Sequence, residues 1–442
     1  SPALVQVTGK DLKIGGNTGG FRINSVGELV LPSGLPCRTA IINKKNQRLS
    51  TKDCSGKVTI EDNGPLRAVI KTQTDIAGQM RIEKRLEFYA GLPLVRIRHT
   101  FIVMGKNDQC EINEMTYHVP VSNKSWNLPR VKNKPLELTP ETGRVQQRFD
   151  DKYIFTAHPD KMYKGRIVGN AIGGKCFIGL RHFWQNYPKS FDAADGGLKI
   201  GLCPDFKKGL YDKFPFEREG HHLYFYLLNG VYKFPRGMAK THEMMISFDA
   251  SPQQAASADL FQRPLLATAQ PQWYCRSNVF YAVAPRDKSK FKVYEENIDR
   301  NLKNYVKSRE RARDYGLMNF GDWYGERGAN WGNIEYDTQH AFLLEYIRSG
   351  HEAAFFLADE TEKHNRDIDT VHWNKNPNKE GLVYVHQMGH TGRYYKKSVP
   401  GTLGIPRAGG SVSHSWAEGH FNHYFLTGDR RSYDTGRLIA DY

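Results

Sequence analysis

The sequence predicts a multidomain protein with an antiparallel β-sandwich in its first part and helical hairpins in its second part. Three observations support this prediction. The chain has 442 residues, which at roughly 100 to 200 residues per domain is enough for several domains. Apolar and polar residues alternate with a period of two in much of the sequence before Gln262. After Pro252, the spacing of apolar residues lengthens toward the helical period of about 3.6.

The first part contains many short segments with strand-like alternation. The clearest are Val58–Ile60, Arg67–Thr72, Arg81–Phe88 and Leu94–Val103, and further strands are expected at Lys175–Leu180, His222–Leu228 and His242–Phe248. Clusters of Gly, Pro, Asn and Lys separate these segments. Short strands between such turn residues are typical of a large β-sandwich.

The second part contains segments with apolar residues at helical spacing. Helices are expected at Tyr294–Tyr315, Thr338–Arg348, Glu352–Asp367 and Ser415–Leu426, with Gly350 as a helix stop. Successive antiparallel hairpins joined by Gly-rich loops indicate an α/α toroid, although a helical solenoid would give the same pattern. The hairpins before Tyr442 are too few to close a ring, so we expect an incomplete toroid.

The composition is strongly basic. Lys and Arg number 63 against 47 Asp and Glu, which gives a net charge of +16 and favours anionic partners. The basic strands between Arg81 and Arg98 lack the interleaved aromatic residues of RNA-binding sheets and also contain Glu83 and Glu87. We therefore expect a solvated sheet face there and no nucleic-acid partner.

Two further classes of protein are disfavoured. No stretch approaches the roughly 18 apolar residues of a membrane span, so no membrane span is expected. The six cysteines include no CxxC pair, and so they indicate neither a zinc ribbon nor a redox motif.

Four segments together resemble a known family. They are Asp62–Lys71, Glu87–Phe101, Asn319–Tyr324 and Ser413–Gly419, and in this order they resemble the exo-rhamnogalacturonan lyase-like family of polysaccharide lyases. The resemblance implies an N-terminal RIFT-type barrel, a central β-sandwich and a C-terminal α/α toroid. The expected domains are a partial barrel over residues 1–57, the sandwich over 58–262 and the first portion of the toroid over 263–442.

The same resemblance implies a function. It suggests a secreted or periplasmic enzyme that cleaves a uronate-containing glycan by β-elimination, with rhamnogalacturonan or ulvan, in which rhamnose neighbours a uronate, as the best substrate expectation. An acidic polysaccharide would then be the anionic partner that the net charge favours. The oligomeric state is not indicated by the sequence.

Such a lyase needs a cation or donor on the uronate carboxylate, a base and an acid. The candidates for the carboxylate are Arg393 and Arg327, because Arg offers paired donors. For proton transfer, the Gly-punctuated stretch Val383–Tyr395 carries several His and Tyr side chains. The expected catalytic residues are His386, His390, His414, Tyr394 and Arg393, with Tyr384 as a substrate contact. The alternative is that these His are ordinary partly buried or solvated side chains.

Two other segments are candidates for sugar binding. His414 enters a predicted helix after a Gly-rich loop, together with Trp416 and Glu418; the alternative is that Ser413 or Ser415 caps the start of this helix. The second segment, Gly321–Asn333, contains glycines that allow sharp backbone turns and aromatic side chains that such turns can expose to a sugar. Its expected substrate contacts are Trp323, Tyr324, Arg327, Asn330 and Trp331. A structural loop anchored by two core indoles is the alternative.

One cluster has metal-capable side chains without a metal-binding motif. His364, Asp367, Asp369 and His372 could ligate a divalent cation, but neither HExxH nor EF-hand spacing is met. A salt-bridged helix end that includes Lys363 and Arg366 is the favoured interpretation. We therefore expect no cofactor.

Two rival functions remain open at this level. A glycoside hydrolase on the same scaffold would use paired carboxylates from the set Asp322, Glu335, Asp337 and Glu418. A non-catalytic protein that binds acidic glycans would need only the basic surface and the aromatic loops.

Overall fold

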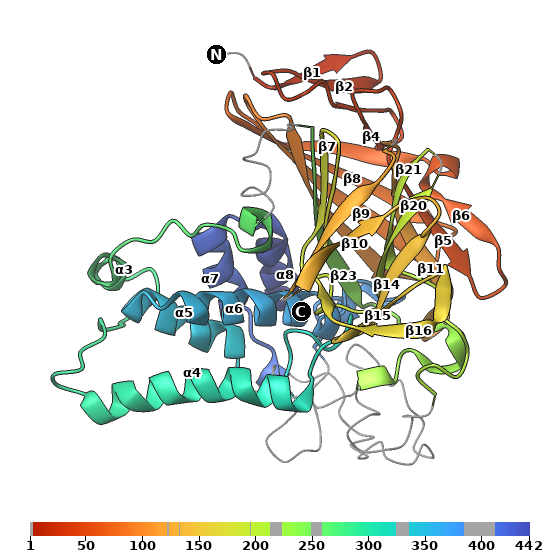
Figure 1. The fold of residues 1–442 in the computed structure, drawn as a ribbon. Helices are drawn as coiled ribbons and strands as arrows, with labels where there is room; N and C mark the ends of the chain where they lie inside the picture. The colour runs from red at the N-terminus through yellow and green to blue at the C-terminus, as the bar shows by residue number, and fades with distance from the viewer. Residues whose placement is uncertain are drawn as a thin grey trace.

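The computed structural model describes residues 3–121, 123–131, 133–194, 196–212, 223–248, 259–323, 336–383 and 412–442. Antiparallel sheets form the first part and helices the second, and Figure 1 shows the helices lying to one side of the strands. None of the described helices is long and apolar enough to cross a membrane.

The first large sheet has the strand order β13-β12-β18-β19-β23-β10-β9-β8-β7, with β17 paired to β12. Its strands are β7 (Gly56–Asn63), β8 (Arg67–Ile76), β9 (Met80–Tyr89), β10 (Leu94–Val103), β12 (Trp126–Val131), β13 (Asn133–Leu138), β17 (Arg166–Ile167), β18 (Asn170–Gly173), β19 (Cys176–Leu180) and β23 (Ala239–Ser247). The expected strands at Arg67–Thr72, Arg81–Phe88, Leu94–Val103 and His242–Phe248 are thus confirmed.

The second large sheet has the order β16-β15-β14-β20-β21-β11-β5-β6, with β22 paired to β11. Its strands are β5 (Arg38–Asn43), β6 (Arg48–Ser50), β11 (Gln109–Val119), β14 (Arg144–Phe149), β15 (Lys152–Phe155), β16 (His158–Lys164), β20 (Lys189–Ala194), β21 (Gly197–Cys203) and β22 (Tyr232–Pro235). Ile97 of β10 and Met115 of β11 belong to one buried apolar cluster, so the two sheets share a core.

A small sheet lies at one end of the sandwich (Figure 1). It contains β1 (Val5–Thr8), β2 (Asp11–Ile14), β3 (Arg22–Ile23) and β4 (Leu29–Val30). The next two strands, β5 and β6, also precede residue 57, but β5 pairs with β11 of the second large sheet. The domain boundaries at residues 57 and 262 remain predictions.

The strand expected at His222–Leu228 is wrong. Its described residues, 223–228, have helical, turn and bend conformations, and Leu228–Gly230 form a short 3-10 helix. Leu223 and the four residues after it are all buried. A short, fully buried apolar run has no polar face, so its periodicity cannot distinguish a strand from other buried segments.

The helical part consists largely of antiparallel hairpins. The helices are α3 (Pro271–Ser277), α4 (Lys292–Ala312), α5 (Thr338–Ser349), α6 (Glu352–His364), α7 (Glu418–Thr427) and α8 (Arg430–Ala440). The shorter pieces are 3-10 turns at Thr51–Asp53, Pro377–Lys379 and Val412–His414 and a π-helix at Asn365–Asp369. Gly350 ends α5 with a φ of 72°, a left-handed conformation that glycine adopts without strain. The expected helix at Ser415–Leu426 begins later, at Glu418.

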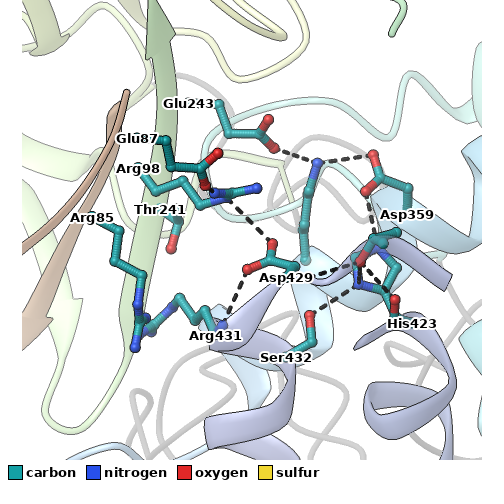
Figure 2. A network of polar contacts seen from close by, with 12 residues as sticks. Arg85, Glu87, Arg98, Thr241, Glu243, Asp359, His423, Asp429, Arg431 and Ser432 are labelled. Carbon is teal, nitrogen blue, oxygen red and sulfur yellow. Dashed lines mark hydrogen bonds and ion pairs between the residues drawn. The ribbon is translucent and has the colours of Figure 1, made fainter. Parts of the chain in front are cut away.

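A buried ion network joins the first sheet to the helices (Figure 2). Glu83, Arg85 and Glu87 of β9 are at most 5% exposed, which contradicts the expectation of a solvated sheet face. Helices α6 and α8 cover this face, and their side chains pair with those of the strands: Arg85 with Asp434, Arg98 with Asp429 and Lys363 with Glu243. Alternation cannot reveal this burial, because both faces of the strand are covered and one of them is covered by charges.

Arg366 lies at the centre of this network. Its side chain is 1% exposed and lies 3.2 Å from both Glu362 and Asp429, and its Nε lies 3.3 Å from Asp367. Asp429 also begins α8, where it accepts a hydrogen bond from the Arg431 N–H at 3.1 Å. The favoured interpretation of this helix end as salt-bridged is confirmed for Arg366 and Asp367.

We expect the substitution Arg366→Met to destabilise the fold by about 3 to 5 kcal/mol, because it leaves buried carboxylates without their cation. Urea unfolding followed by circular dichroism measures this difference. Arg437→Met is the matched control, since Arg437 and Asp441 form an exposed pair that typically contributes less than about 1 kcal/mol. Equal effects of the two substitutions would contradict the central role of Arg366.

His423 makes the stability of this network depend on pH. Burial opposes protonation of its ring, but Glu362, Asp359 and Asp429 outweigh burial and raise the pKa of His423. A raised pKa in the folded state means that the stabilisation is complete below the unfolded value of about 6.5 and is lost as pH rises through the folded value. We expect the melting temperature to fall less steeply above pH 6.5 in His423→Gln than in the unsubstituted protein. Parallel melting curves against pH would exclude this contribution.

Candidate active site

Three proton-handling side chains meet where α5 and α7 begin. Asp337 precedes α5, His340 lies in its first turn, and Glu418 is the first residue of α7. One oxygen or ring nitrogen of each lies within 4.8 Å of the others. Gly419 permits this approach, because a Cβ at this position would lie 2.7 Å from Asp337 Oδ1 and 2.4 Å from Gln339 Cγ.

A chain of polar contacts runs through these residues. The Tyr281 hydroxyl donates to Glu418 Oε1 at 3.1 Å, and Glu418 Oε2 lies 3.9 Å from His340 Nε2. The other ring nitrogen, Nδ1, lies 2.9 Å from the side-chain amide of Asn422. Asn422 thus fixes the orientation of the His340 ring. The hydrogen bond from Tyr281 to Glu418 raises the pKa of Tyr281, which therefore keeps its proton at neutral pH.

Asp337 is the buried member of the set. It is 5% exposed and its backbone has a left-handed φ of 46°. Burial raises the pKa of its carboxyl group, although His340, His420 and nearby backbone N–H groups oppose this effect. Among the described residues, neither oxygen has a partner that satisfies hydrogen-bond geometry.

Several aromatic residues lie next to this cluster, some as neighbours in sequence and some through side-chain contacts. Tyr281 and Tyr336 are 60% and 55% exposed, and Trp416 is 37% exposed. Tyr336 directly precedes Asp337, and Trp416 lies two residues before Glu418. The ring of Trp323 stacks on Tyr336 with the centroids 6.5 Å apart. Exposed rings of this kind can stack on the apolar faces of sugars.

The described residues include four of the predicted site residues. Glu418 lies within the cluster, Trp416 lies next to it in sequence, and Trp323 reaches it through Tyr336. His414 ends the 3-10 turn Val412–His414, just before Trp416. The remaining predicted site residues lie outside the described residues: Tyr324, Arg327, Asn330, Trp331, Tyr384, His386, His390, Arg393 and Tyr394.

Sequence reasoning missed three members of this site. His340, Tyr281 and Asn422 were not among the candidates, and Asp337 was one only for the rival hydrolase. The spacing of Asp337 and His340, three residues apart at a helix start, places both on one face of the helix and was an available signal. Tyr281 gave no such signal, because it lies in a loop and meets Glu418 only in the folded chain.

A second cluster involves two of the four metal-capable residues named above. His364 Nε2 lies 3.2 Å from Asp322 Oδ2 and 3.5 Å from Asp369 Oδ2. Burial opposes protonation of His364, but the two carboxylates raise its pKa to about 9. Asp367 instead accepts a hydrogen bond from the Thr241 N–H at 2.7 Å, and the His372 ring contacts the Arg366 carbonyl. The four residues therefore do not converge on one point.

Comparison with known proteins finds a family model that matches the helical part. Residues 264–440 match the model of the PcRGLX-like protein C-terminal alpha/alpha toroid domain. The match confirms the expected α/α toroid and supports the resemblance to exo-rhamnogalacturonan lyase-like proteins.

A curated relative is the "Uncharacterized protein YetA" of Bacillus subtilis (strain 168). It is 25% identical over an alignment of 338 residues, and the alignment covers 67% of this chain and 36% of YetA. The chain thus spans little more than a third of this relative.

Two solved structures align with part of this chain at low similarity. An alpha-mannosidase from Enterococcus faecalis V583 gives a TM-score of 0.32 at 10% identity, over 59% of this chain and 31% of its own. The GH36 alpha-galactosidase AgaB from Geobacillus stearothermophilus gives a TM-score of 0.34 at 9% identity, over 56% and 41% respectively. TM-scores this low do not define a shared fold.

We expect Gly419→Ala to separate α7 from α5, because the added methyl group overlaps Gln339 and the Asp337 carboxylate. Overpacking of this kind costs about 1 to 3 kcal/mol, whereas a tolerated Gly→Ala change in a helix stabilises by about 0.4 to 1 kcal/mol. The sign of the change in the urea midpoint is therefore the test. A stabilised variant would contradict the close contact between the two helix starts.

Proposed function

We propose that this protein is a polysaccharide lyase that cleaves a uronate-containing glycan by β-elimination. The best candidate substrates are rhamnogalacturonan and ulvan, in which rhamnose neighbours a uronate, and a secreted or periplasmic location is part of the proposal. The match of residues 264–440 to the PcRGLX-like toroid domain supports carbohydrate processing. The observation that carries the proposal is the Tyr281–Glu418–His340 chain of contacts beside exposed aromatic rings.

The reaction breaks two bonds and forms one double bond. A base removes the C5 proton of the uronate, the C4–O4 bond breaks as the C4=C5 double bond forms, and an acid protonates O4 of the departing sugar. Tyr281 is suited to the role of acid, because its hydroxyl is exposed and carries a proton that it donates to Glu418. His386, His390, His414 and Tyr394 remain the predicted candidates for the base, and Arg393 and Arg327 remain candidates for the carboxylate.

One observation favours the rival hydrolase as a second candidate. Asp337 and Glu418 present oxygens within 4.8 Å of each other, and burial raises the pKa of Asp337. Retaining glycosidases place an acid and a nucleophile about 5 to 5.5 Å apart. In that mechanism the nucleophile displaces the departing sugar at the anomeric carbon, and water then displaces the nucleophile from that carbon, so the products are saturated and carry new reducing ends.

Product analysis separates these candidates. The protein is incubated with rhamnogalacturonan, ulvan and other uronate polymers, and both the ultraviolet absorbance of the C4=C5 bond and the number of reducing ends are followed. Absorbance that rises together with reducing ends is the expected result. Reducing ends without absorbance would establish the hydrolase instead. Binding of the polymers without either product would identify a glycan-binding protein and overturn both enzymatic proposals.

We expect Tyr281→Phe to lower kcat by about 100-fold or more with little change in KM, because general acid catalysis contributes about 10² to 10⁴ in rate. Initial rates of unsaturated-product formation measure both constants. Tyr294→Phe is the matched control, since Tyr294 is also an exposed tyrosine but lies on α4. An unchanged kcat in Tyr281→Phe would exclude Tyr281 as the acid.

A further inference from the structure

The described part of the site has the wrong charge for a uronate. Asp337 and Glu418 place two carboxyl groups within 4.8 Å of each other, and the only cation-capable partner within this group of three is the His340 ring. A uronate carboxylate brought into this space meets like charge, and like charges at short range repel by several kcal/mol when partly shielded from water. The site therefore needs additional positive charge before it can hold such a substrate.

The donor atoms form a set that suits a divalent cation. Two carboxylate oxygens and one imidazole nitrogen approach within 4.8 Å of one another. Mixed oxygen and imidazole donors suit Mn²⁺ and Zn²⁺, whereas Ca²⁺ and Mg²⁺ prefer oxygen alone. The side chains come from two helix starts, and Gly419 allows these helices to approach closely.

His340 is held as metal-binding histidines usually are. Its Nδ1 lies 2.9 Å from Nδ2 of Asn422, and a flip of this amide places its oxygen at the same point. When the amide oxygen faces Nδ1, it accepts the Nδ1 proton and leaves the Nε2 lone pair toward Glu418. Metal-binding His residues commonly have their second nitrogen fixed in this way.

Asp337 differs from the other buried carboxylates of the helical part. Asp359, Asp367 and Asp429 each pair with Arg, Lys or protonatable His side chains. Asp337 has no ion pair with a described Lys or Arg, and neither of its oxygens has a hydrogen bond of acceptable geometry there. Its carboxyl group faces the His340 and His420 rings and the backbone N–H groups of His340 and Gly419, but no described Lys or Arg, and a bound cation would supply the charge that these neighbours balance only in part.

We propose that Asp337, His340 and Glu418 bind one divalent cation of the Mn²⁺ or Zn²⁺ class at the starts of α5 and α7. Asp337 is the buried anchor, and the half-exposed Glu418 closes the site from the solvent side. The open coordination positions accept the uronate carboxylate, a step that rests on the proposed lyase function. The cation there supplies the charge that the site lacks and stabilises the carbanion-like charge that develops as C5 loses its proton.

Calorimetric titration tests the site without substrate. Protein treated with a chelator and dialysed is titrated with MnCl₂ and, separately, with ZnCl₂. We expect one site per chain, and at least a tenfold loss of affinity in Glu418→Gln and in Asp337→Asn. Glu418 is 52% exposed, so its substitution leaves the core intact. Glu352→Gln, which changes an exposed carboxylate of α6, should bind as the unsubstituted protein does.

Asp322→Asn tests the other cluster with cation-ligand geometry, formed by Asp322, His364 and Asp369. Binding that survives Glu418→Gln but is lost in Asp322→Asn would move the cation to that cluster and overturn the proposal. Absence of binding by either metal to the folded protein would overturn it as well.

The outcomes for the cation and for the lyase are separable. A protein that binds one cation at Glu418 but forms no unsaturated product supports the cation site and refutes the lyase function. Formation of unsaturated product at the same rate after chelation, with no cation bound, refutes the cation site and leaves the lyase function standing.

Discussion

The buried ion network between the first sheet and the helices is the interaction on which the arrangement of this protein depends. The charged face of β9 and β10 is largely buried, where Glu83, Arg85 and Arg98 lie against side chains of opposite charge at the start of α8 and within it: Arg431, Asp434 and Asp429. Removing several charges from water is unfavourable unless the pairing is nearly complete. The network therefore restricts how the helices can sit on the sheet, whereas an apolar interface would tolerate sliding.

This restriction extends to the candidate active site. Helix α6 carries Glu362, which contacts both Arg366 in the network and the His420 ring on α7 at 2.9 Å. His423, one turn further along α7, contacts Asp359 of α6 at 3.1 Å. Helix α7 is thereby fixed against α6, and its first residue, Glu418, is held beside Asp337 and His340. The position of Glu418 thus depends on charges that lie outside the site itself.

Much of the architecture could be predicted from local pattern. Strands β8 to β10 and helices α4 to α6 lie where alternation and helical spacing indicated, because the apolar side of each element produces a periodic pattern in the sequence. Periodicity does not identify the secondary structure where every side chain is buried, as in the segment from Leu223 to Leu227. It also misleads where charged residues are buried by other charges, as for Glu83 and Arg85.

The sequence by itself determined the order of a β-sandwich and helical hairpins and the stop at Gly350, because these depend on neighbouring residues. It also named Glu418, Trp416 and Trp323 as site residues, but it assigned no role to His340, Tyr281 or Asn422. Only the tertiary structure brought Asp337 to Glu418, which lies 81 positions later in the chain. The physical reason is that this contact depends on the packing of α5 against α7, and the periodicity of one segment does not show which distant helix it packs against.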